Sequence, residues 1–199
     1  MVKSFLQNLI DKFISNIKND SDFEFYNEAG LQHEVLYFLR KEIGLKYKVY
    51  AEKNINTIHS PKKADFVKKE IDIYIQNKIN PKEKYAIELK YFSANHNAIP
   101  RLMSHIIVDI KFLEELKKEA HFNECLFLIF TPKRIFYKGT GQRGIYKIFQ
   151  HTNIIKSLTK SDTPDFLHES MEKFTLKKSY KFQWKVYSDN SHRYFTVLI

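Results

Sequence analysis

The chain has 199 residues, of which 43% are hydrophobic, 15% aromatic and 28% charged. This composition excludes a disordered polyampholyte and suffices for the core of one globular domain over residues 1–199. The formal net charge of +10 at pH 7 favours a polyanionic partner, and nucleic acid is the partner that we expect.

The basic excess lies in the last third of the chain. Residues 131–160 contain seven basic and no acidic residues, and residues 173–188 contain five basic and no acidic residues. These two segments together exceed the whole net charge, so the rest of the chain is close to neutral. An AT-rich genome also raises the lysine content of a protein, so charge by itself leaves nucleic-acid binding open.

The single cysteine, Cys125, excludes a disulfide framework and fits a reducing compartment. The first 17 residues lack the continuous apolar segment of a secretory signal. No apolar run approaches the roughly 20 residues that span a bilayer. We therefore expect a cytoplasmic protein with no membrane partner.

Hydrophobic periodicity predicts alternating helices and strands. In chain order we expect helices over 3–18 and 27–43, strands over 46–55, 70–77 and 84–92, a helix from Pro100, a strand over 124–132, a short helix over 152–158 and a β-hairpin over 180–199. Gly44 is the stop signal of the second helix. The continuous apolar run over 124–132 is typical of a strand that is buried on both faces.

Acidic residues occupy an unusual place in the hairpin predicted over residues 70–90. The Asn80-Pro81 pair marks its turn, and if the ladder is centred on residue 80, paired residue numbers sum to 160 and Asp72 lies opposite Glu88. A slip of one residue would break this pairing, and the sequence leaves both registers open. Strand alternation then predicts one polar and one apolar face. The polar face holds Glu70, Asp72, Tyr74, Glu88 and Lys90, and the apolar face holds Ile71, Ile73, Ile75, Ile87 and Leu89.

This arrangement points to metal chemistry. Opposed side chains on paired strands are about 5 Å apart, and two carboxylates at that distance repel one another unless a cation lies between them. Oxygen ligands of this kind suit Mg²⁺ or Mn²⁺, which can polarise a phosphodiester and acidify water. Lys90, two positions after Glu88, could orient or deprotonate that water and offset developing charge.

Asp72, fifteen intervening residues and then Glu88-Leu89-Lys90 resemble the D…ExK signature of the PD-(D/E)XK nuclease superfamily. The resemblance implies metal-dependent cleavage of DNA, with Asp72, Glu88 and Lys90 as the catalytic residues. It departs from the signature at Ile71, where the superfamily often has proline. Longer stretches, among them NEAGLQHEVLYFLR and IIVDIKFLEEL, are similar to a little-characterised bacterial branch of these proteins.

The fold that the resemblance implies is an α/β restriction-endonuclease-like core of helix, three-strand meander, helix and strand. The expected elements over about 27–132 follow this order and would form a mixed sheet flanked by helices. Residues 133–199 would then be a basic C-terminal appendage that ends in the β-hairpin.

In this superfamily a further metal ligand often comes from the first core helix. On a helix over 27–43, Glu28 and Gln32 fall within the apolar face, whereas Glu34 falls on its flank. We therefore expect Glu28 to bind the metal and Gln32 to hold a metal ligand in place. On the helix that follows the ExK strand, Asp109 could contact Lys90 or Arg101, or be an ordinary acid on the flank of the helix.

Three basic residues are candidates for contacts with nucleic-acid phosphates. Arg143 lies in the glycine-rich segment KGTGQRG, and Lys181 and Lys185 alternate with Tyr180, Phe182 and Trp184. The same alternation is expected if the aromatic rings pack on the core and the lysines face water. Both interpretations remain open.

A metal-dependent endonuclease is the function that these residues favour. One alternative is a non-catalytic nucleic-acid-binding module of the same fold, and another is an interaction subunit whose basic faces recognise an acidic protein. A homodimer would allow both strands of a duplex to be cut, although no interface signature is present in the sequence.

Overall fold

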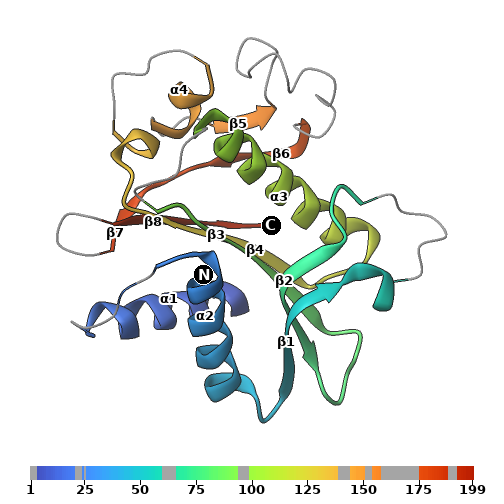
Figure 1. Cartoon of the computed structure of the whole chain (residues 1–199). Coiled ribbons are helices and arrows are strands. Elements are labelled where there is room, and N and C mark those ends of the chain that lie inside the picture. Colours follow the sequence, from blue (N-terminus) through green and yellow to red (C-terminus); the bar gives the residue numbers. More distant parts are fainter. Residues whose placement is uncertain are drawn as a thin grey trace.

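The protein is described here by a computed structural model. The residues that it describes are 4–20, 24, 26–59, 66–93, 99–138, 144–150, 154–157, 175–187 and 192–199. Within them, a mixed sheet lies between two helical layers, as Figure 1 shows. The fold is therefore α/β.

The sheet has six strands in the order β1-β2-β3-β4-β8-β7. Their bounds are β1 Tyr47–Asn54, β2 Glu70–Asn77, β3 Lys84–Tyr91, β4 Glu124–Thr131, β7 Lys185–Val186 and β8 Arg193–Leu198. β3 and β4 are parallel and every other neighbouring pair is antiparallel. β3 is consequently a central strand, hydrogen-bonded on both sides.

The two faces of the sheet are covered by different elements (Figure 1). α1 (Phe5–Lys18) and α2 (Glu28–Ile43) pack on one face. α3 (Ile99–Glu119), α4 (Gly144–Gln150) and β6 (Thr175–Lys181) pack on the other. β6 pairs with β5 (Ile154–Ser157) in a separate two-stranded sheet. Short 3-10 turns, η1 and η2, span Ile55–Thr57 and Arg134–Phe136.

The seven elements predicted before residue 133 are confirmed, with ends within two residues wherever the structure describes them. Local capping explains these boundaries. The side chain of Ser4 accepts a hydrogen bond from Gln7 N at 3.1 Å, and that of Asn27 accepts one from Gly30 N at 2.7 Å. None of the described helices combines the length and the apolar character that a membrane span requires.

The C-terminal predictions are only partly correct. The prediction of a helix over 152–158 is wrong, because Ile154–Ser157 forms strand β5. The expected hairpin exists as β7 and β8, but β8 also pairs with β4 inside the main sheet. Residues 193–198 are therefore part of the sheet and not of an appendage. β4 is buried on both faces, so the backbone groups on the side away from β3 need hydrogen-bond partners other than water. β8 supplies them.

The face alternation predicted for residues 70–90 holds with one exception. The side chains that pack with α1 and α2 are Ile73, Ile75, Ile87 and Leu89. Tyr74 packs on the α3 side as expected, but Ile71 packs there too. β2 therefore changes the face that it presents between residues 71 and 73. In the neighbouring strand, Glu52 lies between the partners of Ile71 and Ile73 and has a φ of 49°.

Glu114 connects β6 to α3. Its buried carboxylate accepts hydrogen bonds from Lys177 N at 2.7 Å, Lys178 N at 2.8 Å and the Tyr180 hydroxyl at 2.9 Å. Three donors from β6 thus satisfy one acid on the helix. The small second sheet is held against the core by this contact as well as by apolar packing.

We expect Glu114→Ala to lower the free energy of unfolding by about 3 kcal/mol, because two backbone amides and a hydroxyl lose their acceptor. Urea unfolding followed by circular dichroism measures this change. Glu119→Ala is the matched control: this partly exposed carboxylate on the same helix forms surface ion pairs with Lys118 and, at 3.7 Å, with Lys177, which contribute little, so its removal should leave the midpoint nearly unchanged. Equal midpoints for the two variants would contradict the anchoring role.

Candidate active site

The acids of β2 and β3 meet where the two strands diverge. The register runs from Gln76 opposite Lys84 to Ile73 opposite Ile87, so the predicted sum of 160 is confirmed. Beyond that pair, side chains replace the backbone ladder. Asp72 N donates to Glu88 Oε1 at 3.3 Å, and Leu89 N donates to Asp72 Oδ2 at 2.7 Å.

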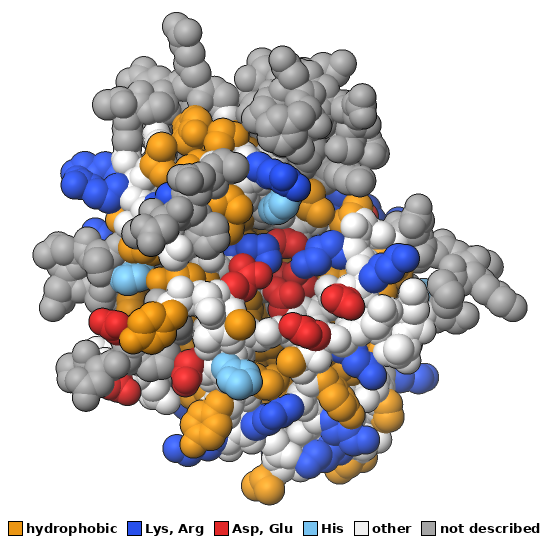
Figure 2. All heavy atoms as spheres, in the orientation of Figure 1, with side chains coloured by type: hydrophobic (Ala, Val, Ile, Leu, Met, Phe, Trp, Pro, Cys, Tyr) orange, Lys and Arg blue, Asp and Glu red, His pale blue; other side chains and the backbone are white. Residues whose placement is uncertain are grey.

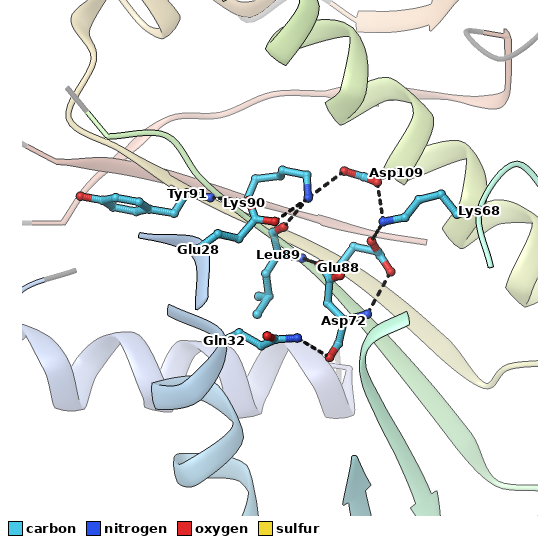
Figure 3. Close-up of polar contacts among 9 residues, drawn as sticks. All are labelled: Glu28, Gln32, Lys68, Asp72, Glu88, Leu89, Lys90, Tyr91 and Asp109. Atoms are coloured by element: carbon cyan, nitrogen blue, oxygen red, sulfur yellow. Dashed lines mark hydrogen bonds and ion pairs between the residues drawn. The ribbon is translucent and has the colours of Figure 1, made fainter. Parts of the chain in front are cut away.

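These two hydrogen bonds hold each carboxylate against the partner strand. Asp72 and Glu88 therefore lie together, as Figure 3 shows, and not on opposite sides of the sheet. Gln32 of α2 donates from Nε2 to the backbone oxygen of Asp72 at 2.9 Å. Gln32 therefore lies beside the acids, but its partner is the backbone and not a carboxylate, so its support of a bound metal stays a prediction.

Glu88 is fully buried, with 0% of its surface exposed. Burial raises the pKa of its carboxyl well above the ordinary value, and the nearby charge of Asp72 raises it further. The opposing influence is Lys68, whose Nζ donates to Glu88 Oε2. An acid in this position needs a cation, because an isolated buried carboxylate is costly.

Lys68 was not expected from the sequence. It follows a polar segment that has no periodicity and is separated from the first residue of β2 by Lys69, so no pattern marked it as a site residue. In the structure its Nζ also donates to Asp109 Oδ1 at 2.8 Å. Burial by itself lowers the pKa of Lys68, but attraction to Glu88 and Asp109 outweighs that effect and the net pKa is raised. Lys68 is therefore a charged ammonium.

Asp109 lies between two lysines, as Figure 3 shows. The side chain is on α3 and is 3% exposed. Besides the Lys68 contact, its Oδ2 lies 3.4 Å from Lys90 Nζ. Of the readings of Asp109 that the sequence allowed, the contact with Lys90 is the one found. This acid is part of the site.

Lys90 points to the same side of the sheet as Glu88. Its Nζ donates to Glu28 Oε1 at 3.0 Å and to the backbone oxygen of Leu89 at 2.9 Å. Burial lowers the pKa of Lys90, whereas the charges of Asp109 and Glu28 raise it by more, so the net pKa is raised. The ammonium thus has acidic partners on both α2 and α3.

Glu28 contacts Lys90 and not the paired acids of β2 and β3. Its second oxygen, Oε2, accepts a hydrogen bond from Tyr91 N at 3.3 Å, and 43% of its side chain is exposed. The predicted inward direction of Glu28 is therefore correct, and its contact in this structure is an ion pair. Glu34, one helical turn beyond Gly30, is exposed.

The four acids and two lysines form one connected set. The acids are Glu28, Asp72, Glu88 and Asp109, and the lysines are Lys68 and Lys90. Figure 2 shows acidic side chains gathered near the centre of one face, with basic side chains around them. The set retains a formal excess of negative charge, which favours a further cation.

The chemistry of the paired acids fits a hard divalent cation. Asp72 and Glu88 offer carboxylate oxygens from adjacent strands. Burial, and after it the charge of Asp72, raises the pKa of the Glu88 carboxyl, and a bound cation would oppose both effects. Among the residues that the structure describes, no three His, Cys, Asp or Glu side chains are grouped as a metal-binding cluster. Lysine ammonium groups contact Glu88, Asp109 and Glu28 instead.

The nucleic-acid candidates lie away from these acids or outside the described residues. Arg143 is outside them. Lys181 and Lys185 are exposed, and β4 and β8 separate the strand of Lys185 from β3. Between the lysines, Phe182 is fully buried. The aromatic rings of this segment therefore pack on the core, and base stacking on Phe182 is excluded.

Comparisons with known proteins add no residue to this set. Scans against models of protein families, against curated proteins and against solved structures found no match. The residues brought together by the contacts above are Glu28, Gln32, Lys68, Asp72, Glu88, Lys90 and Asp109.

The raised pKa of Glu88 predicts how stability depends on pH in the metal-free protein. Folding favours the protonated carboxyl, so this contribution is fully present below the ordinary pKa of 4.5 and is lost as pH rises through the raised value. Lys68 and Lys90 keep their protons throughout this range. The free energy of unfolding of the wild type, relative to Glu88→Gln, should therefore fall as pH rises.

Urea unfolding in EDTA at a series of pH values from about 4 to 8 measures this difference. Asp11→Asn, on the far helix α1, serves as a control for the general effect of removing a carboxylate. A difference between wild type and Glu88→Gln that stays constant with pH would contradict the raised pKa.

Proposed function

We propose that this protein is a divalent-metal-dependent endonuclease that hydrolyses phosphodiester bonds, with DNA as its substrate and Mg²⁺ or Mn²⁺ as its cofactor. The observation that carries the proposal is that Asp72 of β2 and Glu88 of β3 lie side by side, with Lys90 on the same side of the sheet as Glu88. The order α2-β1-β2-β3-α3-β4 also supports the restriction-endonuclease-like core that the D…ExK resemblance implies.

Asp72 and Glu88 would hold the metal. When bound, such an ion polarises a phosphate oxygen and makes a water molecule more acidic. The chain's part is to keep two carboxylates in place before the ion arrives. Asp72 and Glu88 each accept a hydrogen bond from a backbone amide of the neighbouring strand, which fixes the direction of the carboxylate. The other oxygen of Glu88 accepts from Lys68.

Lys90 would stabilise negative charge on the phosphate in the transition state. Its raised pKa supports a protonated ammonium and makes proton abstraction from water the less favourable of the two roles considered for it. Glu28 and Asp109 position the ammonium from α2 and α3. Gln32 holds the backbone of Asp72.

The net charge of +10 supports a polyanionic substrate, and the preference for DNA over RNA comes from the resemblance alone. The exposed Lys181 and Lys185 remain candidates for phosphate contacts at a distance from the acids. A homodimer, which would cut both strands, also remains a proposal.

The second candidate function is a nucleic-acid-binding module of the same fold without catalysis. One observation favours it: ammonium groups already contact three of the four acids. In that case the acids and lysines would stabilise the fold and would have no role in chemistry.

Asp72→Asn and Lys90→Ala should each lower Mg²⁺-dependent or Mn²⁺-dependent DNA cleavage by about 100-fold or more, because one removes a metal ligand and the other a charge that stabilises the transition state. DNA affinity, measured by fluorescence anisotropy, should change little. Glu70→Gln, an exposed acid at the start of β2, is the matched control and should cleave at the wild-type rate.

Cleavage at the wild-type rate in both site variants would refute the nuclease assignment. If the protein is a non-catalytic binding module, the wild type should bind DNA without cutting it. It should bind DNA with an affinity that falls steeply with salt, and should cut no duplex, flap, junction or single strand with either metal.

Glu28→Gln separates two roles of that carboxylate. If Glu28 positions Lys90, the variant should cleave about tenfold more slowly while the metal concentration for half-maximal rate stays unchanged. A metal titration of the cleavage rate measures both quantities. A rate that recovers fully at high metal concentration would make Glu28 a metal ligand, as the sequence first suggested.

A further inference from the structure

The Lys68 ammonium lies where a cation bound to the buried acids would lie. Its Nζ donates to Glu88 Oε2 and, at 2.8 Å, to Asp109 Oδ1 (Figure 3). These carboxylates are 0% and 3% exposed, so water cannot replace Lys68 as their partner to any large extent. One positive group therefore bridges two acids from β3 and α3.

The backbone on both sides of Lys68 is held separately from this contact. Val67 N donates to Glu115 Oε2 at 2.9 Å, and Ile55 N donates to Lys69 O at 2.8 Å. The lysine Nζ lies 5.7 Å from the centre of the Phe112 ring, and 25% of the side chain is exposed. The ammonium can consequently leave the acids by rotation of its own side chain, while the backbone stays in place.

At Glu88 Oε2 a divalent cation would compete with the Lys68 ammonium for the same carboxylate oxygen. Both would be positive charges within a few ångströms of each other in a buried environment, where repulsion is weakly screened. Lys68 differs in this respect from Lys90, whose hydrogen-bond partners are Glu28 and a backbone carbonyl. A metal at Glu88 therefore competes with Lys68 directly.

We infer that Lys68 is an internal counter-ion of the metal site: it holds Glu88 and Asp109 in place without metal, and a divalent cation binds by displacing it. The inference rests on the proposed function, because it concerns the same acids. It adds Asp109 to the carboxylates that face the bound ion, and it assigns to Lys68 a positioning role that ends when the metal enters.

Lys68→Met removes the charge and keeps the apolar stem over Phe112. If the ammonium occupies the site about nine-tenths of the time, its removal should tighten Mn²⁺ binding by about tenfold, since apparent affinity scales with the fraction of competent protein. Isothermal titration with MnCl₂ measures the dissociation constant. In EDTA the variant should melt at a lower temperature than wild type, and Mn²⁺ should raise its melting temperature by more.

Lys12→Met is the matched control. Lys12 forms an ion pair with Glu42 at 2.6 Å between α1 and α2, away from the acids, so its loss should leave Mn²⁺ affinity unchanged. Equal or weaker Mn²⁺ binding by Lys68→Met than by wild type would overturn the inference and leave the nuclease proposal standing. If neither protein binds Mn²⁺, both the inference and the proposed function fail.

A second measurement uses the wild-type chain and does not depend on the variant folding. Lysine acetylation by an N-hydroxysuccinimide ester, followed by mass spectrometry, reports the accessibility of each ammonium. Mn²⁺ should increase the labelling rate of Lys68 severalfold and leave that of Lys12 unchanged. Labelling of Lys68 that does not rise with saturating Mn²⁺ would show that the ammonium stays in place, and would overturn the inference.

Discussion

The burial of one carboxylate, Glu88, governs the design of this site. β3 is a central strand, and the Glu88 side chain on its α3 face is fully buried. The cost of removing such a charge from water is several kcal/mol unless charged or polar partners replace the solvent. Asp72 N supplies one partner and Lys68 supplies the other. Three further charged side chains of the site each lie beside a partner of opposite charge: Asp109, Lys90 and Glu28.

The result is a chain of alternating charges that connects both helical layers to the sheet. It runs from Glu88 through Lys68 to Asp109, and from there through Lys90 to Glu28. Such a network holds the carboxylates in one direction, as the proposed metal site requires before the ion arrives. It also carries more acid than base, an excess that the proposed metal ion would offset. A metal-dependent reaction on a phosphodiester is consistent with that electrostatic balance.

The two buried acids Glu114 and Glu88 differ in the kind of partner that satisfies them. Glu114 is satisfied by two backbone amides and a tyrosine hydroxyl, which remain where the fold places them. Glu88 is satisfied in part by a lysine side chain that can rotate. An acid whose partners are fixed stabilises the fold, whereas one whose partner can leave is able to exchange it for another cation. This difference supports a functional role for Glu88 and a structural role for Glu114.

The elements before residue 133 were predictable from local patterns, and so was the register that brings Asp72 beside Glu88 if the turn is centred on residue 80, because strand alternation, capping residues and turn residues act over short distances. The sequence by itself did not determine strand β5, the entry of β8 into the sheet, or the contacts of Lys68 and Asp109. Lys68 and Asp109 are 41 positions apart, and they meet only because the crossover helix between β3 and β4 packs over the acids. Periodicity reports which face a side chain occupies, and only the packing of distant elements decides which faces touch.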